Sequence, residues 1–472
     1  MASRAVSGET ASSRCEGKGT TVAPDLVFML TQPAVERPNS RQGQICTHSE
    51  RPDRIFEKVL EVAREAGLVG RKRVLDSTAL YDAVATQDTV TLIRSAIRAL
   101  FRVVDKQLGA ELRASCRRDD DYAAPGKPIC DWDDAAARET LIDALARDAH
   151  AILAILDGQI LSGGVMEAAK LLATVVGQDL ELVDDLFRIA RRVAKDRVIS
   201  IVDPEARHGH KTAARGFDGY KGHIAIDPDS EIITATAVTA GNVADGAVTD
   251  VLLHELLAPT PTATQAAPLP LQESVLPTVC ETAASATPAA RAPPPKATVY
   301  GDASYGTAEI VEMIEAAGAE ANVKVQAPSA PAGCFTKADF KIDVDANTVT
   351  CPAGVLVQIG KSAGGGGHAQ FGKACAGCKL GFQCTESKTG RTVNIHPKEK
   401  TLQRTRERQG TPEWKVDYRA TRPKVERKLA HLMFRRHGGR RARMRGQLRV
   451  RGDFVMLAAA TNLKRMAMLK VL

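Results

Sequence analysis

Apolar residues recur at helical spacing in several stretches of this chain. Residues 55–66 place apolar side chains at steps of four, three and four residues, and this spacing predicts a helix that ends at Gly67. The same spacing over residues 93–108 predicts a second helix, and further helices are predicted from about 133 to 156 and through 165–195. The apolar faces of these helices need a partner, which indicates a helical insertion in a larger domain.

Short apolar runs rich in β-branched residues predict strands elsewhere in the chain. They lie at residues 74–75, 197–202, 223–226 and 232–238, and a DPDS turn joins the last two as a hairpin. The run Thr298–Gly301 predicts another strand, which a glycine-rich turn and an amphipathic helix follow. Strands that alternate with helices predict an α/β fold with a mixed sheet.

Composition shifts divide the chain into eight predicted segments, because Pro/Ala-rich and Ser/Thr-rich stretches lack any periodicity. The predicted segments are a disordered leader (1–50), the start of the sheet core (51–80), a helical insertion (81–195), core strands (196–257), a Pro/Ala-rich linker (258–297), a further core segment (298–330), a Cys-rich insertion (331–411) and a helical and basic C-terminal segment (412–472).

Charge is unevenly distributed along the 472 residues, although the net charge is only +8. Residues 427–451 contain ten Lys and Arg and no Asp or Glu. Such a block favours a polyanionic partner such as nucleic acid, and the alternative is an ordinary solvated basic face. No apolar run is long enough to cross a membrane, and no signal sequence opens the chain, so we expect a cytoplasmic protein without a membrane partner.

Four carboxylates stand where metal ligands are often presented. Asp76, Asp203 and Asp302 each directly follow a predicted strand, and Glu426 lies in the first turn of a helix predicted after Pro423. Two divalent metals suit the cleavage of a phosphodiester, and Mg²⁺ prefers such oxygen ligands. The alternatives are that Asp302 caps the next helix and that Glu426 only complements a helix dipole.

Cysteines cluster in the Cys-rich segment of a chain that has ten of them. Cys375 and Cys378 have the spacing of a metal knuckle, and Cys351 and Cys384 could complete four thiolates around a structural Zn²⁺. Cys334 is near enough in sequence to replace one of them. The alternative is a set of free cysteines that pack as small apolar residues.

Five separated stretches together resemble one family, in matching order. They are VLDSTALYDAVATQDT (74–89), the segment from DPEARHGHK to AGNVADG (203–246), VYGDASYG (299–306), the CPAG…C..C…CT segment (351–385) and YRATRPKVERKLAHL (418–432). In these stretches the chain resembles bacterial insertion-sequence transposases of the DDE (Asp-Asp-Glu) type. It is most similar to the subgroup that carries a cysteine-rich insertion before the catalytic glutamate.

The resemblance implies an RNase-H-like catalytic core, a mixed sheet with helices on both faces, interrupted by the helical insertion and by a small zinc-ribbon-like insertion. It implies that Asp76, Asp302 and Glu426 are the catalytic triad and hold two Mg²⁺ or Mn²⁺ ions. Asp203 is the competing candidate for the first position, and Asp76 is preferred because DST matches the family's Asp-x-Thr strand end.

Accessory and DNA-binding residues follow from the same resemblance and from the basic segment. Tyr418 and Arg422 are expected beside the triad, where Arg422 could orient Glu426 or contact a phosphate. The expected DNA-binding residues are Lys211, Arg215, Arg435, Arg436, Arg440, Arg441, Arg443 and Arg445.

The family chemistry is cleavage at the element's ends by water, followed by attack of the freed 3′-hydroxyl on target DNA. The implied partners are double-stranded DNA, both element ends and target, and a second copy of the chain as a homodimer on DNA, at the bacterial nucleoid. The chain departs from the family pattern because the usual N-terminal helical region has no counterpart, Arg422 is shifted by one residue and Met433 replaces a lysine. The alternative function is therefore a truncated, catalytically inactive copy that only binds DNA.

Overall fold

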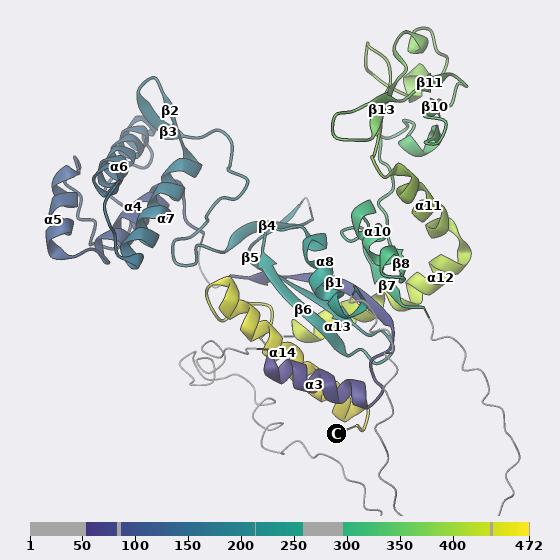
Figure 1. Ribbon diagram of the computed structural model, residues 1–472. Helices are drawn as coiled ribbons and strands as arrows, with labels where there is room; N and C mark the ends of the chain where they lie inside the picture. The colour runs from purple at the N-terminus through teal and green to yellow at the C-terminus, as the bar shows by residue number, and fades with distance from the viewer. Residues whose placement is uncertain (1–52, 83–85, 213, 258–295, 435–437, 472) are drawn as a thin grey trace, which may run out of the picture.

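The computed structural model describes residues 53–82, 86–212, 214–257, 296–434 and 438–471. Figure 1 shows three bodies along the chain: a central sheet with its helices, a helical unit on one side and a small Cys-rich unit on the other. The predicted leader and nearly all of the predicted linker lie outside the described residues. No helix within the described ranges is long and apolar enough to cross a membrane.

The central sheet is mixed, as the sequence predicted, and it contains six strands. They are β1 (Lys72–Tyr81), β4 (Arg207–Thr212), β5 (Arg215–Ile226), β6 (Ile233–Ala240), β7 (Thr298–Gly301) and β8 (Glu320–Val323). The main order is β4-β5-β1-β7-β8, and β6 also pairs with β5. β5 runs antiparallel to β1 and β6, which confirms the predicted hairpin, whereas β7 is parallel to both β1 and β8.

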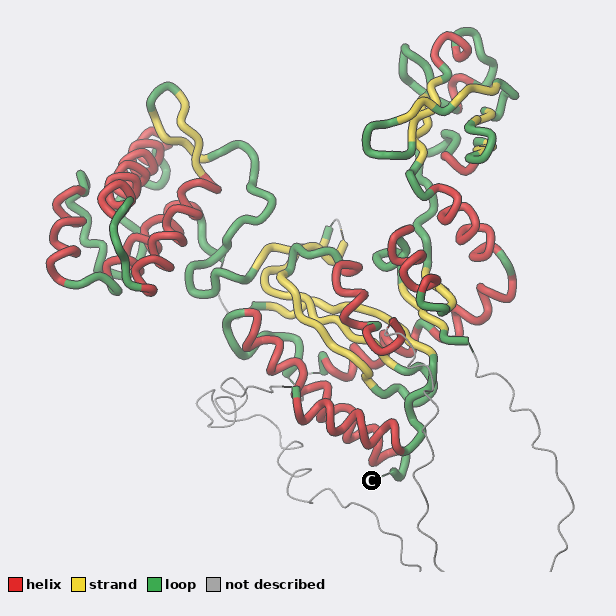
Figure 2. Tube along the Cα trace, viewed as in Figure 1, coloured by secondary structure: helices red, strands yellow, loops and turns green. Residues whose placement is uncertain are grey.

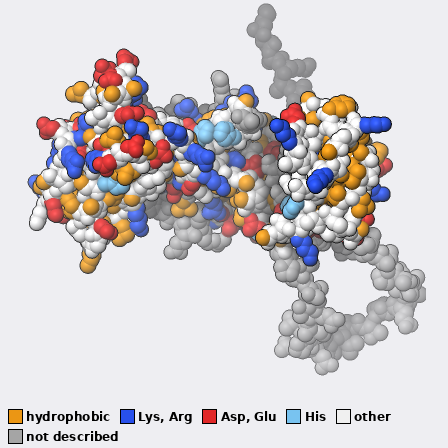
Figure 3. Space-filling model, turned by 90° about the horizontal axis from the view of Figure 1, so that it is seen from above, with side chains coloured by type: hydrophobic (Ala, Val, Ile, Leu, Met, Phe, Trp, Pro, Cys, Tyr) orange, Lys and Arg blue, Asp and Glu red, His pale blue; other side chains and the backbone are white. Residues whose placement is uncertain are grey.

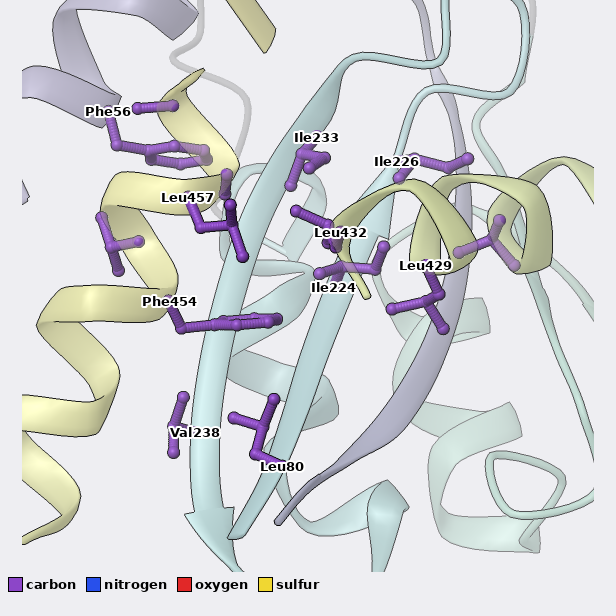
Figure 4. Close-up of a cluster of buried hydrophobic side chains, with 14 of the residues drawn as sticks. Phe56, Leu80, Ile224, Ile226, Ile233, Val238, Leu429, Leu432, Phe454 and Leu457 are labelled. Carbon is purple, nitrogen blue, oxygen red and sulfur yellow. The ribbon is translucent and has the colours of Figure 1, made fainter. Parts of the chain in front are cut away.

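Helices cover both faces of this sheet (Figure 2). Successive residues of a strand point to opposite sides, so apolar residues of one strand can contribute to the core on either face. Val74 and Leu80 face a core that includes α3 (Arg54–Glu65), α13 (Pro423–Leu432) and α14 (Gln447–Met468), and Figure 4 shows this packing. Leu75 faces the second core, beneath η1 (Asp245–Val248), α8 (Thr249–Leu252), α9 (His254–Leu257) and α10 (Ala308–Ala316). The sheet is therefore buried on both faces.

Along the chain, the helical unit lies between β1 and β4, and it has its own core. Its elements are α4 (Thr89–Phe101), α5 (Lys106–Ser115), α6 (Ala135–Leu156), α7 (Gly163–Asp179), β2 (Leu180–Val183) and β3 (Leu186–Ile189). The prediction of one helix over 93–108 was wrong, since α4 and α5 are separate. The helices predicted over 165–195 are confirmed by α7 as far as residue 179 and are wrong beyond it, because Asp184 and Asp185 adopt φ of 50° and 59° and form the two-residue turn of a hairpin.

Residues 197–202 form no strand, contrary to the prediction. Their backbone groups find other partners: the Val198 amide donates to Gln178 Oε1 at 2.8 Å, and the Ile201 amide donates to Gln87 Oε1 at 3.2 Å. The buried side chains of Val198 and Ile199 explain the apolar run without a sheet ladder. This segment connects the helical unit to β4.

The Cys-rich unit contains two small antiparallel sheets that share one core. Its elements are η2 (Lys337–Asp339), β9 (Lys341–Asp343), β10 (Thr348–Thr350), β11 (Leu356–Gln358), β12 (Gly360–Lys361), β13 (Gly367–Gln370), η3 (Gly372–Cys375), η4 (Gly381–Gln383) and β14 (Thr392–Ile395). β9 and β10 pair antiparallel and form a hairpin. The chain returns to the sheet through α11 (Glu399–Gly410) and α12 (Pro412–Thr421).

Candidate functional site

Asp76 lies in the middle of β1, not at a strand end as the sequence suggested. The strand continues because residues 77–81 remain paired with β5. Its carboxylate is 14% exposed and accepts the Ser77 amide at 2.8 Å. Burial raises the pKa of Asp76, and the neighbouring Arg422 guanidinium counteracts part of that rise.

Asp302 directly follows β7, as predicted, and is 41% exposed. Its Oδ1 accepts the Ser304 amide at 2.9 Å, which fixes the glycine-rich turn. Asp302 does not cap the following helix, because Thr307 is the N-cap of α10 and accepts the Ile310 amide. Asp302 Oδ2 therefore takes part neither in the turn contact with Ser304 nor in the cap of α10.

Glu426 lies in the first turn of α13 and is 64% exposed. Arg422 precedes this helix with φ −58° and ψ −40°, and its amide donates to the Tyr418 carbonyl at 2.9 Å. The helical path thus continues from α12 into α13 through Pro423, and Tyr418 lies inside α12. Arg422 and Glu426 consequently face each other with the i,i+4 spacing.

The Arg422 guanidinium brings the three carboxylates together. Its Nη1 and Nη2 lie 3.1 and 3.0 Å from the two oxygens of Asp76. Nη2 is also 3.7 Å from Asp302 Oδ2, and Nη1 is 3.5 Å from Glu426 Oε1. Burial lowers the pKa of Arg422, but Asp76 and Asp302 raise it further than burial lowers it, so the side chain stays charged.

Helix α12 is docked onto the sheet by residues that the sequence did not single out. Asp417 accepts the Tyr300 hydroxyl at 2.8 Å and Asn322 Nδ2 at 3.0 Å, and Tyr300 and Asn322 are paired on β7 and β8. Tyr418 donates to the Gly301 carbonyl at 3.2 Å and stacks on Trp414 with ring centroids 4.5 Å apart. The sequence signal for this contact is the polar side chain within each of the two short strands, Tyr300 in β7 and Asn322 in β8.

A second polar cluster lies behind Asp76. Asp245 accepts the Ser77 hydroxyl at 2.7 Å and the Lys221 ammonium at 2.8 Å. Tyr305 is fully buried, and its hydroxyl has no hydrogen-bond partner among the described residues. Burial, and then the negative charges of Asp245 and Asp76, raise the pKa of Tyr305 well above its usual value. Sequence reasoning missed this cluster because its members are dispersed among four segments.

Asp203 is separate from the other carboxylates and does not contact Arg422 in the described structure. It is fully buried, where it accepts the Tyr220 hydroxyl at 2.6 Å and the Gly446 amide at 3.2 Å. These contacts fix the start of α14. Asp203 therefore holds buried parts of the fold together, whereas Asp76, Asp302 and Glu426 lie together around Arg422.

The predicted DNA-binding side chains are exposed where the structure describes them. Lys211 and Arg215 lie at the turn between β4 and β5, and Arg440, Arg441, Arg443 and Arg445 precede α14. Figure 3 shows Lys and Arg side chains on the middle part of the molecule. The Tyr81 amide donates to the Arg440 carbonyl at 3.0 Å, which places this basic segment beside the end of β1. Arg435 and Arg436 lie outside the described residues.

The four predicted zinc ligands all line one pocket of about 380 Å³. Cys351, Cys375, Cys378 and Cys384 are free thiols, and burial raises the pKa of the Cys384 thiol. Within the described residues, no group of three or more His, Cys, Asp or Glu is arranged to hold a metal ion. The structure therefore does not support the zinc prediction.

The same finding applies to the triad carboxylates. Their oxygens are the donors that Mg²⁺ and Mn²⁺ prefer, but the Arg422 guanidinium fills the space among them. As the side chains stand, these residues form an ion-pair cluster and do not fit a metal ion.

Comparison with known families gives two matches. Residues 187–265 and residues 350–467 each match a family model described as a transposase DDE domain. The second segment contains Tyr418, Arg422 and Glu426, whereas Asp76 and Asp302 lie outside both. No curated protein and no solved structure matches the chain.

Proposed function

The two matched segments identify the chain as a DDE-type transposase, and from that premise we propose that it cleaves DNA at the ends of a bacterial insertion sequence and joins them to target DNA. The observation that carries this proposal is the cluster of Asp76, Asp302 and Glu426 around Arg422. These three carboxylates come from widely separated parts of the chain, and α/β enzymes commonly assemble their sites in this way at a sheet edge.

An RNase-H-like core is part of the proposal. It is supported by the mixed sheet, in which β1 and β7 are parallel neighbours and present Asp76 and Asp302 on adjacent strands. The Cys-rich unit between β8 and α12 supports assignment to the subgroup with an insertion before the catalytic glutamate. The proposed domain boundaries remain those of the sequence analysis.

Each site residue has a chemical role in this proposal. The family resemblance assigns Asp76, Asp302 and Glu426 to two divalent ions, which would stabilise charge on a phosphodiester. Arg422 would bind a phosphate oxygen, since guanidinium and phosphate form paired hydrogen bonds. Tyr418 keeps α12 against Gly301 and so orients the arginine.

DNA is the proposed partner, and the bacterial nucleoid is the proposed location. Exposed Lys211, Arg215, Arg440 and Arg441 support this choice, because basic side chains bind the phosphate backbone without reading its sequence. A homodimer on DNA completes the proposal, since one copy of the chain would act at each end of the element.

A second candidate function is DNA binding without cleavage. The observation that favours it is the guanidinium among the carboxylates, which leaves them in an ion-pair cluster. An inactive copy would still bind duplex DNA with strong salt dependence through its basic residues.

Strand cleavage of a duplex that carries the element's own ends, with Mn²⁺, tests these candidates. The Asp302→Asn variant removes one carboxylate charge almost isosterically, and we expect cleavage to fall by about a hundredfold or more. Glu413→Gln is the matched control, because Glu413 is an exposed carboxylate on α12, and its cleavage rate should equal that of the wild type.

Three other results would assign a different function. Salt-sensitive binding without cleavage by the wild type would select the inactive copy. Cleavage that survives Asp302→Asn would remove Asp302 from the site. Cleavage without joined products on a supplied target would indicate a metal-dependent nuclease.

A further inference from the structure

The pocket of the Cys-rich unit is separate from the carboxylate site. Its volume of about 380 Å³ is in the range of sites that bind small molecules. All of its lining residues lie between Phe335 and Arg391, so this unit forms the pocket without a contribution from the central sheet. A ligand in the pocket would therefore contact the Cys-rich unit.

The charged side chains that line the pocket are all positive. They are Lys373, Lys388 and Arg391, and the described lining residues include no Asp or Glu. Both lysines are exposed, and neither has an ion-pair partner in the part of the chain that the structure describes. Positive charge that no carboxylate neutralises favours an anionic group on the ligand.

A close backbone contact brings the two lysine-bearing segments together. A Cβ atom at Gly390 would lie 2.5 Å from the Gly372 carbonyl oxygen, and φ of Gly390 is 88°, so only glycine fits at this position. Lys373 follows Gly372 in η3, and Lys388 lies two residues before Gly390. The two ammonium groups thus come from adjacent segments, and the oxygens of a single phosphate can accept hydrogen bonds from both.

Arg391 is held in place by contacts inside the unit. Its Nη1 donates to the Cys384 carbonyl at 3.1 Å, and its Nη2 donates to the Phe335 carbonyl at 3.3 Å. The guanidinium carbon also lies 5.6 Å from the centre of the Phe340 ring. The arginine therefore adds a fixed positive charge to the wall of the pocket.

Most of the remaining lining is apolar. Phe340 and Phe371 are buried, whereas Phe335 is partly exposed and presents ring surface to a ligand. The four thiols pack as small apolar groups. Burial raises the pKa of Cys384, so its thiol stays neutral beside a bound anion. The pocket thus combines an apolar interior with exposed positive charge.

We propose that this pocket binds a nucleotide, whose phosphate contacts Lys373 and Lys388 and whose base lies against Phe335. A nucleotide has both parts that the lining favours, because its phosphate is anionic and its flat base stacks on aromatic rings. A bare phosphate would leave the apolar lining in contact with water, and an apolar ligand would leave the lysines unused.

The nucleotide has two sources, a free mononucleotide or an unpaired nucleotide of a DNA strand. With a DNA strand, the inference rests on the proposed function and adds a contact with single-stranded DNA to it. With a free mononucleotide, the inference is independent of that function. The chemistry of the pocket is the same in both cases.

Isothermal titration calorimetry of the full chain with deoxyadenosine monophosphate (dAMP), in EDTA, tests the pocket. We expect saturable binding of dAMP by the wild type. Lys373→Gln and Lys388→Gln should each weaken it by about tenfold, because each removes a charge-assisted hydrogen bond to the phosphate. Lys341→Gln is the matched control, since Lys341 is exposed on β9 outside the pocket, and its effect should be less than about twofold.

Adenosine and inorganic phosphate, each titrated alone, separate the two halves of the ligand. Each should bind at least about tenfold more weakly than dAMP, because linked groups bind together more tightly than either one alone. Phe335→Leu should weaken dAMP binding by about fivefold through loss of stacking, and it should leave phosphate binding unchanged. Circular dichroism establishes that each variant is folded.

A single-stranded pentadeoxyadenylate distinguishes the two sources. If Lys373→Gln and Lys388→Gln weaken its binding as much as they weaken dAMP binding, the pocket binds a nucleotide of a DNA strand. If the two variants weaken dAMP binding alone, the ligand is a free mononucleotide.

Three results would overturn the proposal. They are lysine variants that bind dAMP and the pentanucleotide as the Lys341→Gln control does, inorganic phosphate that binds as tightly as dAMP, and no saturable binding of either nucleotide ligand. These titrations do not involve DNA cleavage. A failure of the pocket would therefore leave the proposed cleavage untouched, and an inactive carboxylate site would leave nucleotide binding intact.

Discussion

At the scale of single residues, His223 on β5 should make the stability of the protein depend on pH. The ring is fully buried, its Nε2 lies 2.9 Å from Thr239 Oγ1, and its Nδ1 has no partner among the described residues. Burial lowers the pKa of His223 to about 4, Asp245 opposes this shift and Lys221 adds to it. Protonation therefore favours the unfolded state.

The sign of the effect follows from the two pKa values. Above pH 6.5 the imidazole is neutral in both states, and the free energy of unfolding owes nothing to its titration. As the pH falls from 6.5 to 4, only the unfolded state binds the proton, so we expect a loss of roughly 3 kcal/mol. Urea unfolding of the wild type and of His223→Gln at each pH measures this loss as a difference. Parallel pH profiles for the two proteins would contradict the prediction.

Sequence motifs singled out the three carboxylates and placed Arg422 beside Glu426, but they gave no sign of its contact with Asp76. Asp302 and Glu426 follow recognisable local signals, a strand before a glycine-rich turn and a proline at a helix start. The contacts of Arg422 with Asp76 depend on the docking of α12, which no local pattern encodes. Asp203 carried the same local signal as Asp302, and only the tertiary structure separates the two.

At the scale of elements, Asp417 should control the position of α12 and hence that of Arg422. Asp417→Ala would leave the Tyr300 hydroxyl and the Asn322 amide without their shared acceptor. Each unsatisfied group costs about 1–3 kcal/mol, so we expect the free energy of unfolding to fall by roughly 2–4 kcal/mol. Cleavage should fall by more than DNA affinity does, because the shifted helix carries site residues but not the basic segment.

The control for this prediction is Lys415→Ala, which truncates an exposed side chain of the same helix. Tyr300→Phe alone and combined with Asp417→Ala completes a double-mutant cycle in urea. The two changes should be less than additive, because each removes the same hydrogen bond. Additive effects, or an Asp417→Ala variant as stable as Lys415→Ala, would show that this contact does not hold α12.

Two of the differences between the predicted and the observed elements share one physical cause. Residues 197–202 have the composition of a strand, but the side chains of Gln87 and Gln178 satisfy their backbone groups. β1 extends past its apolar run because residues 77–81 pair with β5, and Ser77 also donates to Asp245 of η1. Both outcomes depend on contacts distant in sequence, whereas the β5–β6 hairpin was predictable from its own turn.

At the scale of the whole molecule, the helical unit and the sheet are separate bodies in Figures 1 and 2. The buried cluster of α4, α6 and α7 shares no residue with the clusters on the two faces of the sheet. A unit with its own core can unfold on its own, and a single two-state transition is then not expected. The sequence indicated this division because helical periodicity replaces strand patterns over about a hundred residues.

Independent cores predict that a cavity in one body leaves the other unaffected. Leu145 of α6 and Ile226 of β5 are both fully buried, in different clusters. Leu145→Ala and Ile226→Ala should each destabilise their own body by roughly 2–5 kcal/mol. Differential scanning calorimetry should therefore show each variant lowering a different transition. If both variants lower one common transition, the two bodies unfold together, and the helical unit would then be a permanent part of the sheet domain that positions the carboxylate site.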